Sequence, residues 1–278
     1  MAQDWREEKT SVDEVALEFR VGGSGSPLLL LQGIDDGFEW LPYHDGLAKN
    51  FHLLLPSLPG FGRSKAPAWM DSVDDLAYFM LDFIEKLNLG AVNLLGVGFG
   101  GWVCAEMAAR CPHQLRSLVL ADAFGIKISE PWVREIADIF VLTHEELARL
   151  AWHDPAAAKG MKTPGTPGLS QDDLLESLRR RETIHMLGWR PFMHNPKLLR
   201  RLSRIRVPTL VVWGESDRVV SPDYGRAYQR AIPGSHFKTI SRAGHYPHRE
   251  QPEEFVRAVA DFLLSGSVSL IADEETGA

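Results

Sequence analysis

The chain has 278 residues, of which 45% are hydrophobic and 24% are charged, as is usual for a globular protein with a large core. Its net charge of -7 argues against nucleic acid or an anionic membrane as a partner, because both would be repelled. We therefore expect a small-molecule substrate. The sequence lacks a signal-like apolar region and a membrane span of about 18 apolar residues, so we expect a cytoplasmic protein. The sequence says nothing about its oligomeric state.

Strand and helix patterns alternate along the chain, which predicts an α/β fold with a mostly parallel sheet and helices on both faces. Residues 15–21 alternate as an edge strand does. Ser72 is expected to cap a helix that ends near Gly90, and Pro252 to open the last helix, beyond which the tail is expected to fray. The other expected elements are strands at 27–31, 51–55, 92–95, 117–121, 209–213 and 236–240, and a helix at 102–110.

The strand pattern stops between the fifth and sixth expected strands, at 117–121 and 209–213, where short helical segments rich in Trp, Leu, Arg and His take over. We expect a helical cap at residues 126–205, inserted in an α/β core formed by residues 1–125 and 206–278. Cys104 and Cys111 lie seven positions apart on one expected helix, too far for a disulfide within it and too few for a metal site. Both are expected to be buried thiols.

Residues 94–102 read Leu-Leu-Gly-Val-Gly-Phe-Gly-Gly-Trp, which is the strand-to-helix turn of a G-x-S-x-G nucleophile elbow with Gly98 in the serine position. The same segment permits a second interpretation. Gly96, Gly98 and Gly101 form G-x-G-x-x-G, and Asp122 ends the next strand, as in a dinucleotide-binding unit. One short glycine motif is weak evidence for either interpretation, so the neighbouring motifs have to decide.

Four other blocks accompany the elbow in a characteristic order. They are Leu-Leu-Leu-Leu-Gln-Gly-Ile at 28–34, Leu-Pro-Gly-Phe-Gly-Arg-Ser at 58–64, the strand and Gly-Glu-Ser-Asp loop at 207–217, and Ala-Gly-His-Tyr-Pro-His-Arg-Glu at 243–250. Together the five blocks resemble the α/β-hydrolase family, in which nucleophile, acid and base follow in this order. The dinucleotide alternative accounts for one block of the five. The resemblance implies an α/β-hydrolase fold, with Asp122 left as a structural residue.

The resemblance also implies roles for single residues. Gly98 occupies the nucleophile position, Asp217 that of the triad acid and His245 that of the base, with Asp217 fixing the imidazole tautomer. The backbone N–H groups of Ile34 and Phe99 would form the oxyanion hole. No metal and no cofactor are implied.

Other positions have a structural interpretation that competes with a functional one. Asp35 and Asp36 are expected to form a solvated acidic loop, with contact to a polar substrate group as the alternative. His248 and Arg249 are expected at the surface, and Glu250 is expected to fix the start of the last helix. Aromatic residues expected to wall an apolar substrate pocket, or else simply to pack, are Trp40, Trp152, Trp189 and Phe192.

The function that follows is that of an α/β-hydrolase-family protein for a small apolar ester, amide, lactone or related carbonyl compound. Gly98 disables its acyl-enzyme route, so the chain is either an inactivated variant or a member that naturally lacks the serine. One alternative is a cofactor-free His-Asp enzyme that activates water or abstracts a substrate proton. The other is a non-catalytic ligand-binding protein, as in relatives of the N-myc downstream-regulated type, which resemble this chain in carrying glycine at the elbow.

Overall fold

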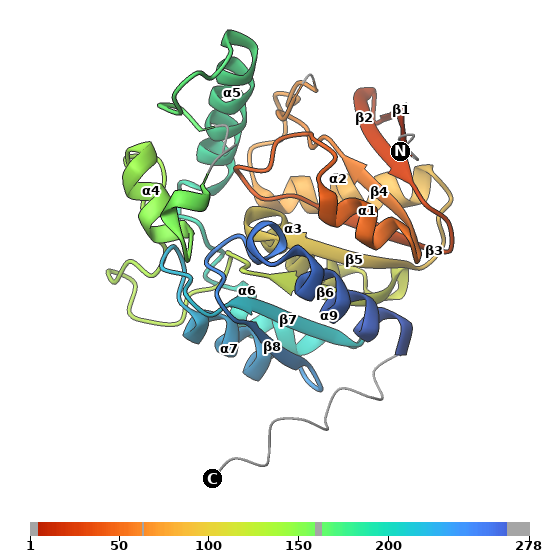
Figure 1. Cartoon of the computed structure of the whole chain (residues 1–278). Helices are drawn as coiled ribbons and strands as arrows, with labels where there is room; N and C mark the ends of the chain where they lie inside the picture. The colour runs from red at the N-terminus through yellow and green to blue at the C-terminus, as the bar shows by residue number, and fades with distance from the viewer. Residues whose placement is uncertain (1–4, 63, 159–162, 266–278) are drawn as a thin grey trace.

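In the computed structural model, which describes residues 5–62, 64–158 and 163–265, one eight-stranded sheet runs through the molecule (Figure 1). The tail beyond Ser265, predicted to fray, lies outside these residues. The strand order is β1-β2-β4-β3-β5-β6-β7-β8. The strands are β1 (Trp5–Val12), β2 (Val15–Gly22), β3 (Ser26–Leu31), β4 (Phe51–Pro56), β5 (Val92–Val97), β6 (Leu115–Ala121), β7 (Thr209–Gly214) and β8 (His236–Ile240).

The sheet is mostly parallel, which confirms the predicted fold class. Strands β3 to β8 pair in parallel, whereas β2 is antiparallel to both β1 and β4. The central strands β5 and β7 are fully buried and mostly apolar because both of their faces are covered by helices. One prediction was wrong: residues 15–21 belong to β2, an inner strand. The edge strand at this end of the sheet is β1, which was not predicted because its Arg, Glu and Lys residues obscure the strand pattern.

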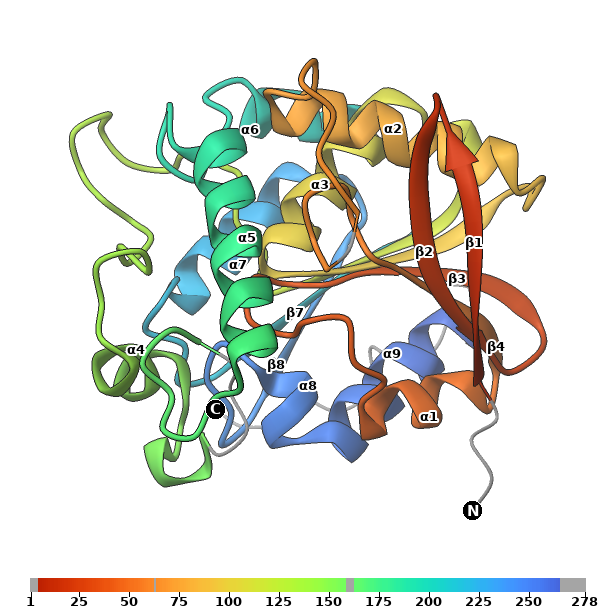
Figure 2. The same cartoon turned by 90° about the horizontal axis from the view of Figure 1, so that it is seen from above.

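Helices cover both faces of the sheet, as Figure 2 shows. One face carries α2 (Val73–Lys86), α3 (Gly98–Arg110) and α7 (Pro222–Ala231), and the other carries α1 (Pro42–Ala48), α8 (Pro247–Glu250) and α9 (Pro252–Ser265). Ser72 caps α2 as predicted, since its hydroxyl accepts from the Asp75 N–H at 3.2 Å. The loops at the carboxyl ends of the strands therefore lie between two layers of helices.

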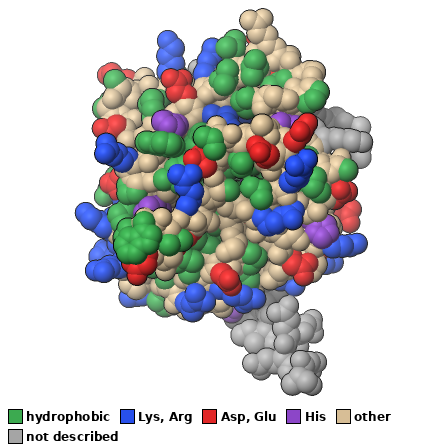
Figure 3. All heavy atoms as spheres, turned by 90° about the vertical axis from the view of Figure 1, so that its left-hand side faces the viewer, with side chains coloured by type: hydrophobic (Ala, Val, Ile, Leu, Met, Phe, Trp, Pro, Cys, Tyr) green, Lys and Arg blue, Asp and Glu red, His purple; other side chains and the backbone are tan. Residues whose placement is uncertain are grey.

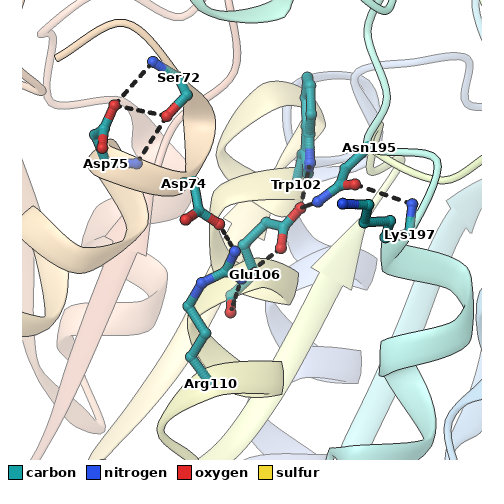
Figure 4. A network of polar contacts seen from close by, with 8 residues as sticks. All are labelled: Ser72, Asp74, Asp75, Trp102, Glu106, Arg110, Asn195 and Lys197. Carbon is teal, nitrogen blue, oxygen red and sulfur yellow. Dashed lines mark hydrogen bonds and ion pairs between the residues drawn. The ribbon is translucent and has the colours of Figure 1, made fainter.

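A buried carboxylate ties α3 to its neighbours. Glu106 accepts hydrogen bonds from Trp102 Nε1 at 3.2 Å, Asn195 Nδ2 at 2.8 Å and Arg110 Nη1 at 2.5 Å (Figure 4). Arg110 also pairs with Asp74 on α2. The network thus joins two helices of one face to the segment that precedes α6 (Leu198–Arg201).

The segment between β6 and β7 is helical, as expected of an insertion. It contains α4 (His144–Ala151), α5 (Gln171–Gly188) and α6, with 3₁₀ turns at Pro155–Ala157 and Leu202–Arg204. In Figure 1, α4 and α5 stand away from the sheet. In contrast, α6 and the turn after it pack against α3 and α7. The boundaries at residues 126 and 205 stay a prediction.

Two further sequence expectations concern burial and the surface. Cys104 is buried, but Cys111 is only half-buried, because it lies beyond the last turn of α3. Both are free thiols. Within the described chain, no helix is both long and apolar enough to span a bilayer. The face shown in Figure 3 mixes acidic, basic and apolar side chains, so charge of a single sign does not dominate it.

Candidate active site

The predicted elbow joins β5 directly to α3. Gly98 is the first residue of the helix, and its φ of +52° lies in the left-handed region that favours glycine. Two residues on, a Cβ on Gly100 would lie 2.1 Å from the carbonyl oxygen of Leu31. The helix start is therefore pressed against β3, and glycine is required there.

The predicted acid and base are brought together. Asp217 follows β7 and His245 follows β8, and His245 Nδ1 lies 2.8 Å from Asp217 Oδ2. Asp217 Oδ1 accepts from the N–H groups of Val219 at 2.8 Å and Val220 at 3.1 Å. Both dyad side chains are buried. This arrangement fixes the imidazole by its Nδ1 and leaves Nε2 as the reactive nitrogen.

The free nitrogen of His245 faces the elbow. A Cβ on Gly98 would lie 3.5 Å from His245 Nε2 and 3.7 Å from Gly33 Cα, which are ordinary contact distances. Ile34 follows Gly33, and Phe99 lies in the first turn of α3, where backbone N–H groups have no intrahelical acceptor. The loop and the helix that carry the two expected oxyanion donors therefore meet beside the dyad.

Aromatic rings enclose the imidazole. Phe124 stacks on His245 with ring centroids 5.2 Å apart and planes 12° apart, and Tyr246 lies edge-on at 5.3 Å. The Phe124 N–H donates to the Gly98 carbonyl at 3.1 Å. The same residue thus supports both the base and the elbow, in surroundings that keep bulk water away from the ring.

The loop after β3 is not solvated, contrary to the expectation for its acidic residues. Asp35 and Asp36 are buried. Asp35 Oδ2 accepts from the Tyr246 hydroxyl at 2.5 Å, and its Oδ1 lies 3.5 Å from Arg181 Nη1. Two acids stay buried here because each has a polar or cationic partner.

The expectation of a surface position for His248 was also wrong. His248 is fully buried, and its Nε2 lies 3.0 Å from Asp36 Oδ1, while Arg249, half-buried, lies 3.9 Å from the same oxygen. Burial alone would raise the pKa of Asp36, but the His248 and Arg249 contacts outweigh it and hold that pKa below its usual range. Nearby, burial lowers the pKa of His44 to about 3.

The inserted helix α5 reaches the same loop. Arg180 is buried, and its Nε donates a hydrogen bond to the Ile34 carbonyl. Thr183, one turn on, donates from Oγ1 to the Gly60 carbonyl at 3.1 Å. Ile34, whose N–H is a predicted oxyanion donor, is therefore held through its carbonyl by α5, a contact for which the sequence carried no local signal.

Glu250 has another role than the one expected. Its Oε2 accepts from the Gly244 N–H at 2.6 Å, and its Oε1 accepts from the His153 N–H at 2.8 Å. The His245 N–H in turn donates to the Ala151 carbonyl at 2.7 Å. Instead of fixing the start of α9, Glu250 fastens the histidine loop to the end of α4.

The four aromatic pocket candidates separate in the structure. Trp152 is buried, with its ring 5.6 Å from that of Tyr246, the neighbour of His245. Trp40 instead stacks on Trp5 of β1, at 5.7 Å. The other two, Trp189 and Phe192, line a surface depression of about 380 Å³, and Trp189 is 43% exposed. Of the four, Trp152 is the one in contact with the surroundings of the dyad.

Asp122 lies beside the dyad as well, although the sequence analysis left it as a structural residue. It is fully buried, so the dinucleotide alternative does not fit. Asp122, Asp217 and His245 each have one potential ligand atom, and these three atoms lie within 4.8 Å of one another. Because Asp217 already uses both of its oxygens on protein donors, this cluster has the character of a hydrogen-bond network rather than a metal site.

Comparison with known proteins shows the family of the chain. The Alpha/beta hydrolase family matches residues 23–258, so the chain belongs to that family. Among curated relatives, the chain is similar to 2-hydroxy-6-oxo-2,4-heptadienoate hydrolase of Pseudomonas putida, with 26% identity over 87% of this chain and 91% of that protein. An uncharacterized protein of Mycobacterium tuberculosis is 28% identical over 88% of this chain and 77% of its own.

Solved structures share the fold. A membrane phospholipase A described as a bacterial virulence factor superposes with a TM-score of 0.78 and 24% identity, covering 94% of this chain and 86% of that one. The enol-lactonase of Burkholderia xenovorans has a TM-score of 0.71 and 22% identity, covering 92% and 100%. At these identities the likeness concerns the fold alone.

Proposed function

We propose that this chain is an α/β-hydrolase-family enzyme for small, mostly apolar carbonyl compounds, in which the His245–Asp217 dyad acts without a side-chain nucleophile. The observation that carries the proposal is the distance of 3.5 Å between a Cβ on Gly98 and His245 Nε2. The base points at a position where the chain supplies no hydroxyl. Its target is then a water molecule or a proton of the substrate itself.

The chemistry requires no cofactor. Nε2 of the neutral imidazole removes a proton from water as the water attacks the substrate carbonyl, and Asp217 stabilises the imidazolium that forms. The N–H groups of Ile34 and Phe99 donate hydrogen bonds to the developing oxyanion. The imidazolium then returns the proton to the leaving group. Esters, amides and lactones fit this sequence.

A second candidate reaction begins with abstraction of a substrate proton. It is favoured by the similarity to 2-hydroxy-6-oxo-2,4-heptadienoate hydrolase, whose named substrate carries an acidic enol as well as a ketone. A purely ligand-binding role is less favoured. A buried His–Asp pair contributes little to stability compared with apolar packing, so the intact dyad is better explained by chemistry. Small molecules remain the proposed partners, and the cytoplasm the proposed location.

The test is a substrate panel with matched histidine variants. Purified protein would be assayed with p-nitrophenyl acetate, a small lactone and 2-hydroxy-6-oxo-2,4-heptadienoate. We expect slow turnover of at least one compound, reduced about 10²-fold or more by His245→Gln. Asp217→Asn should also reduce it, because it favours the wrong tautomer. The exposed His113 provides the control, since His113→Gln should leave the rate unchanged.

The alternatives give different results in this panel. Activity that survives His245→Gln at the wild-type rate would remove the dyad from the mechanism. Turnover of the dienoate alone would favour proton abstraction over attack by water on an ester. Absence of turnover, combined with calorimetric binding of the same compounds, would identify a binding protein.

A further inference from the structure

Asp122 is held rigidly at the carboxyl end of β6. Its φ of +47° lies in the left-handed region, which is sparsely populated by residues other than glycine. Its N–H donates to the Val212 carbonyl at 3.1 Å, and its Oδ1 accepts from the Gly214 N–H at 2.9 Å. These bonds to β7 fix the carboxyl group against the start of the loop that carries Asp217.

The second oxygen of Asp122 has no ordinary donor. In the described part of the chain, no N–H or O–H group donates to Asp122 Oδ2, although that oxygen is buried. The Asp217 carboxyl lies within hydrogen-bonding reach of Asp122. Two carboxylates in contact repel each other, whereas a carboxylic acid and a carboxylate form a strong hydrogen bond. A proton between the two groups satisfies the orphaned oxygen.

The charges around Asp122 favour that proton. Asp217 faces it from the loop after β7, Glu250 from α8 and His245 from the loop after β8. Two of these three groups are acids, and a resting general base has to be a neutral imidazole. Burial, followed by the negative charge of Asp217, raises the pKa of Asp122 well above its usual range.

We propose that Asp122 is a positioning residue of the dyad: a neutral carboxylic acid that donates a hydrogen bond to Asp217. The proposal rests on the proposed function, because it adds a third member to the His245–Asp217 pair. The Asp122 proton stays on Asp122 throughout. Its hydrogen bond locks the orientation of the Asp217 carboxylate and draws negative charge away from the imidazole.

Infrared difference spectroscopy tests the protonation directly. At neutral pH we expect the wild-type spectrum to contain a protonated-carboxyl C=O band that Asp122→Asn removes. Asp36→Asn is the matched control, because Asp36 is an equally buried aspartate whose pKa lies below its usual range, so the band should survive there. Asp217→Asn should shift the band, since the acid then donates to an amide. A wild-type spectrum without any band that depends on Asp122 would overturn the proposal.

An NMR titration of the imidazole tests the positioning role. The His245 ring signals would be assigned by their loss in His245→Gln. Asp122→Asn keeps an N–H donor toward Asp217 and replaces a neutral group, so the titration midpoint of His245 should move by less than about half a pH unit. Asp122→Ala removes the donor and should raise the midpoint by about half a unit or more, because Asp217 then holds its full charge against the ring.

Two outcomes of the titration would contradict the proposal. A fall of more than about one unit in Asp122→Asn would show that Asp122 is ionised in the wild type. An Asp122→Ala midpoint equal to that of the wild type would show that Asp122 does not act through Asp217. Both experiments use the resting protein, so they can fail or succeed independently of whether any substrate is turned over.

Discussion

Gly98 and His245 face each other at the centre of the site, with a Cβ on Gly98 placed 3.5 Å from His245 Nε2. The hydroxyl of a serine, one bond beyond that carbon, would come within hydrogen-bonding reach of the nitrogen. Position 98 therefore has the geometry of a nucleophile position although its residue has no nucleophile. Restoring the hydroxyl is the sharpest test of the site.

We expect Gly98→Ser to convert the protein into an acyl-transfer enzyme. It should hydrolyse a p-nitrophenyl ester with a burst of p-nitrophenol and become labelled by a fluorophosphonate at residue 98. Both properties should disappear when His245→Ala is added. Gly98→Ala is the matched control, because it has the same backbone and no hydroxyl. A folded Gly98→Ser protein that takes no label would show that the dyad is not aligned for acyl transfer.

The same substitution should cost stability. The Cβ meets only ordinary contacts, but φ at position 98 is +52°, where a side chain is strained by about 1 to 3 kcal/mol. Gly98→Ser and Gly98→Ala should therefore both lower Tm by several degrees, as measured by calorimetry. Equal Tm values for wild type and both variants would mean that the turn relaxes to accommodate a side chain.

The contact between the insertion and the loop after β3 should matter for catalysis. Arg180→Met leaves the Ile34 carbonyl without its buried donor, so we expect the free energy of unfolding to fall by about 1.5 to 3 kcal/mol. Because Ile34 carries an expected oxyanion donor, kcat should fall as well, while the variant stays folded. The exposed Arg179 on the same helix provides the control, and Arg179→Met should behave as the wild type. A stability loss without any change in kcat would reduce Arg180 to a packing role.

Much of the architecture could be predicted from the sequence because its central strands are short apolar runs between turn residues. The glycine-rich elbow and the order of the acid and base blocks could also be predicted, because each of these motifs is a short continuous stretch of sequence. Strand β1 could not be predicted, because its exposed residues are charged. Helix α1, for which no pattern was recognised, was also missed.

The buried polar network could not be predicted either. Asp36 and His248 meet although 212 positions separate them, and Asp35 and Tyr246 are 211 positions apart. Aspartate and histidine occur at the surface in most proteins, so residue type alone gives the wrong environment. Only the folded chain supplies the partners that make burial of these groups possible.

Acid should destabilise the protein through His44. The pKa of His44 is about 3 in the fold against 6.5 when unfolded, so between these values the unfolded chain binds more protons. The contribution of the neutral His44 to the free energy of unfolding is thus complete above pH 6.5. It is lost as the pH falls toward 3, by about 1.4 kcal/mol per pH unit. Asp122, whose pKa is raised, acts in the opposite direction, so the comparison has to be made against a variant.

His44→Gln removes the titrating group and is the variant to compare. The free energy of unfolding would be measured in urea at pH 7, 6, 5 and 4. At each lower pH, we expect the wild type to lose stability relative to His44→Gln. Parallel pH profiles for the two proteins would contradict a neutral buried His44.

The hydrogen bond from Arg180 to Ile34, together with the Arg181–Asp35 pair, has a consequence for protein engineering. A chimaera that replaces residues 126–205 by the corresponding segment of another family member would leave the Ile34 carbonyl without its donor and Asp35 without its cationic partner. The donor segment would have to bring two adjacent arginines at the matching helical position, or the recipient loop would have to lose its acid. The insertion and the loop after β3 would therefore have to be exchanged together, although more than a hundred residues of sequence lie between them.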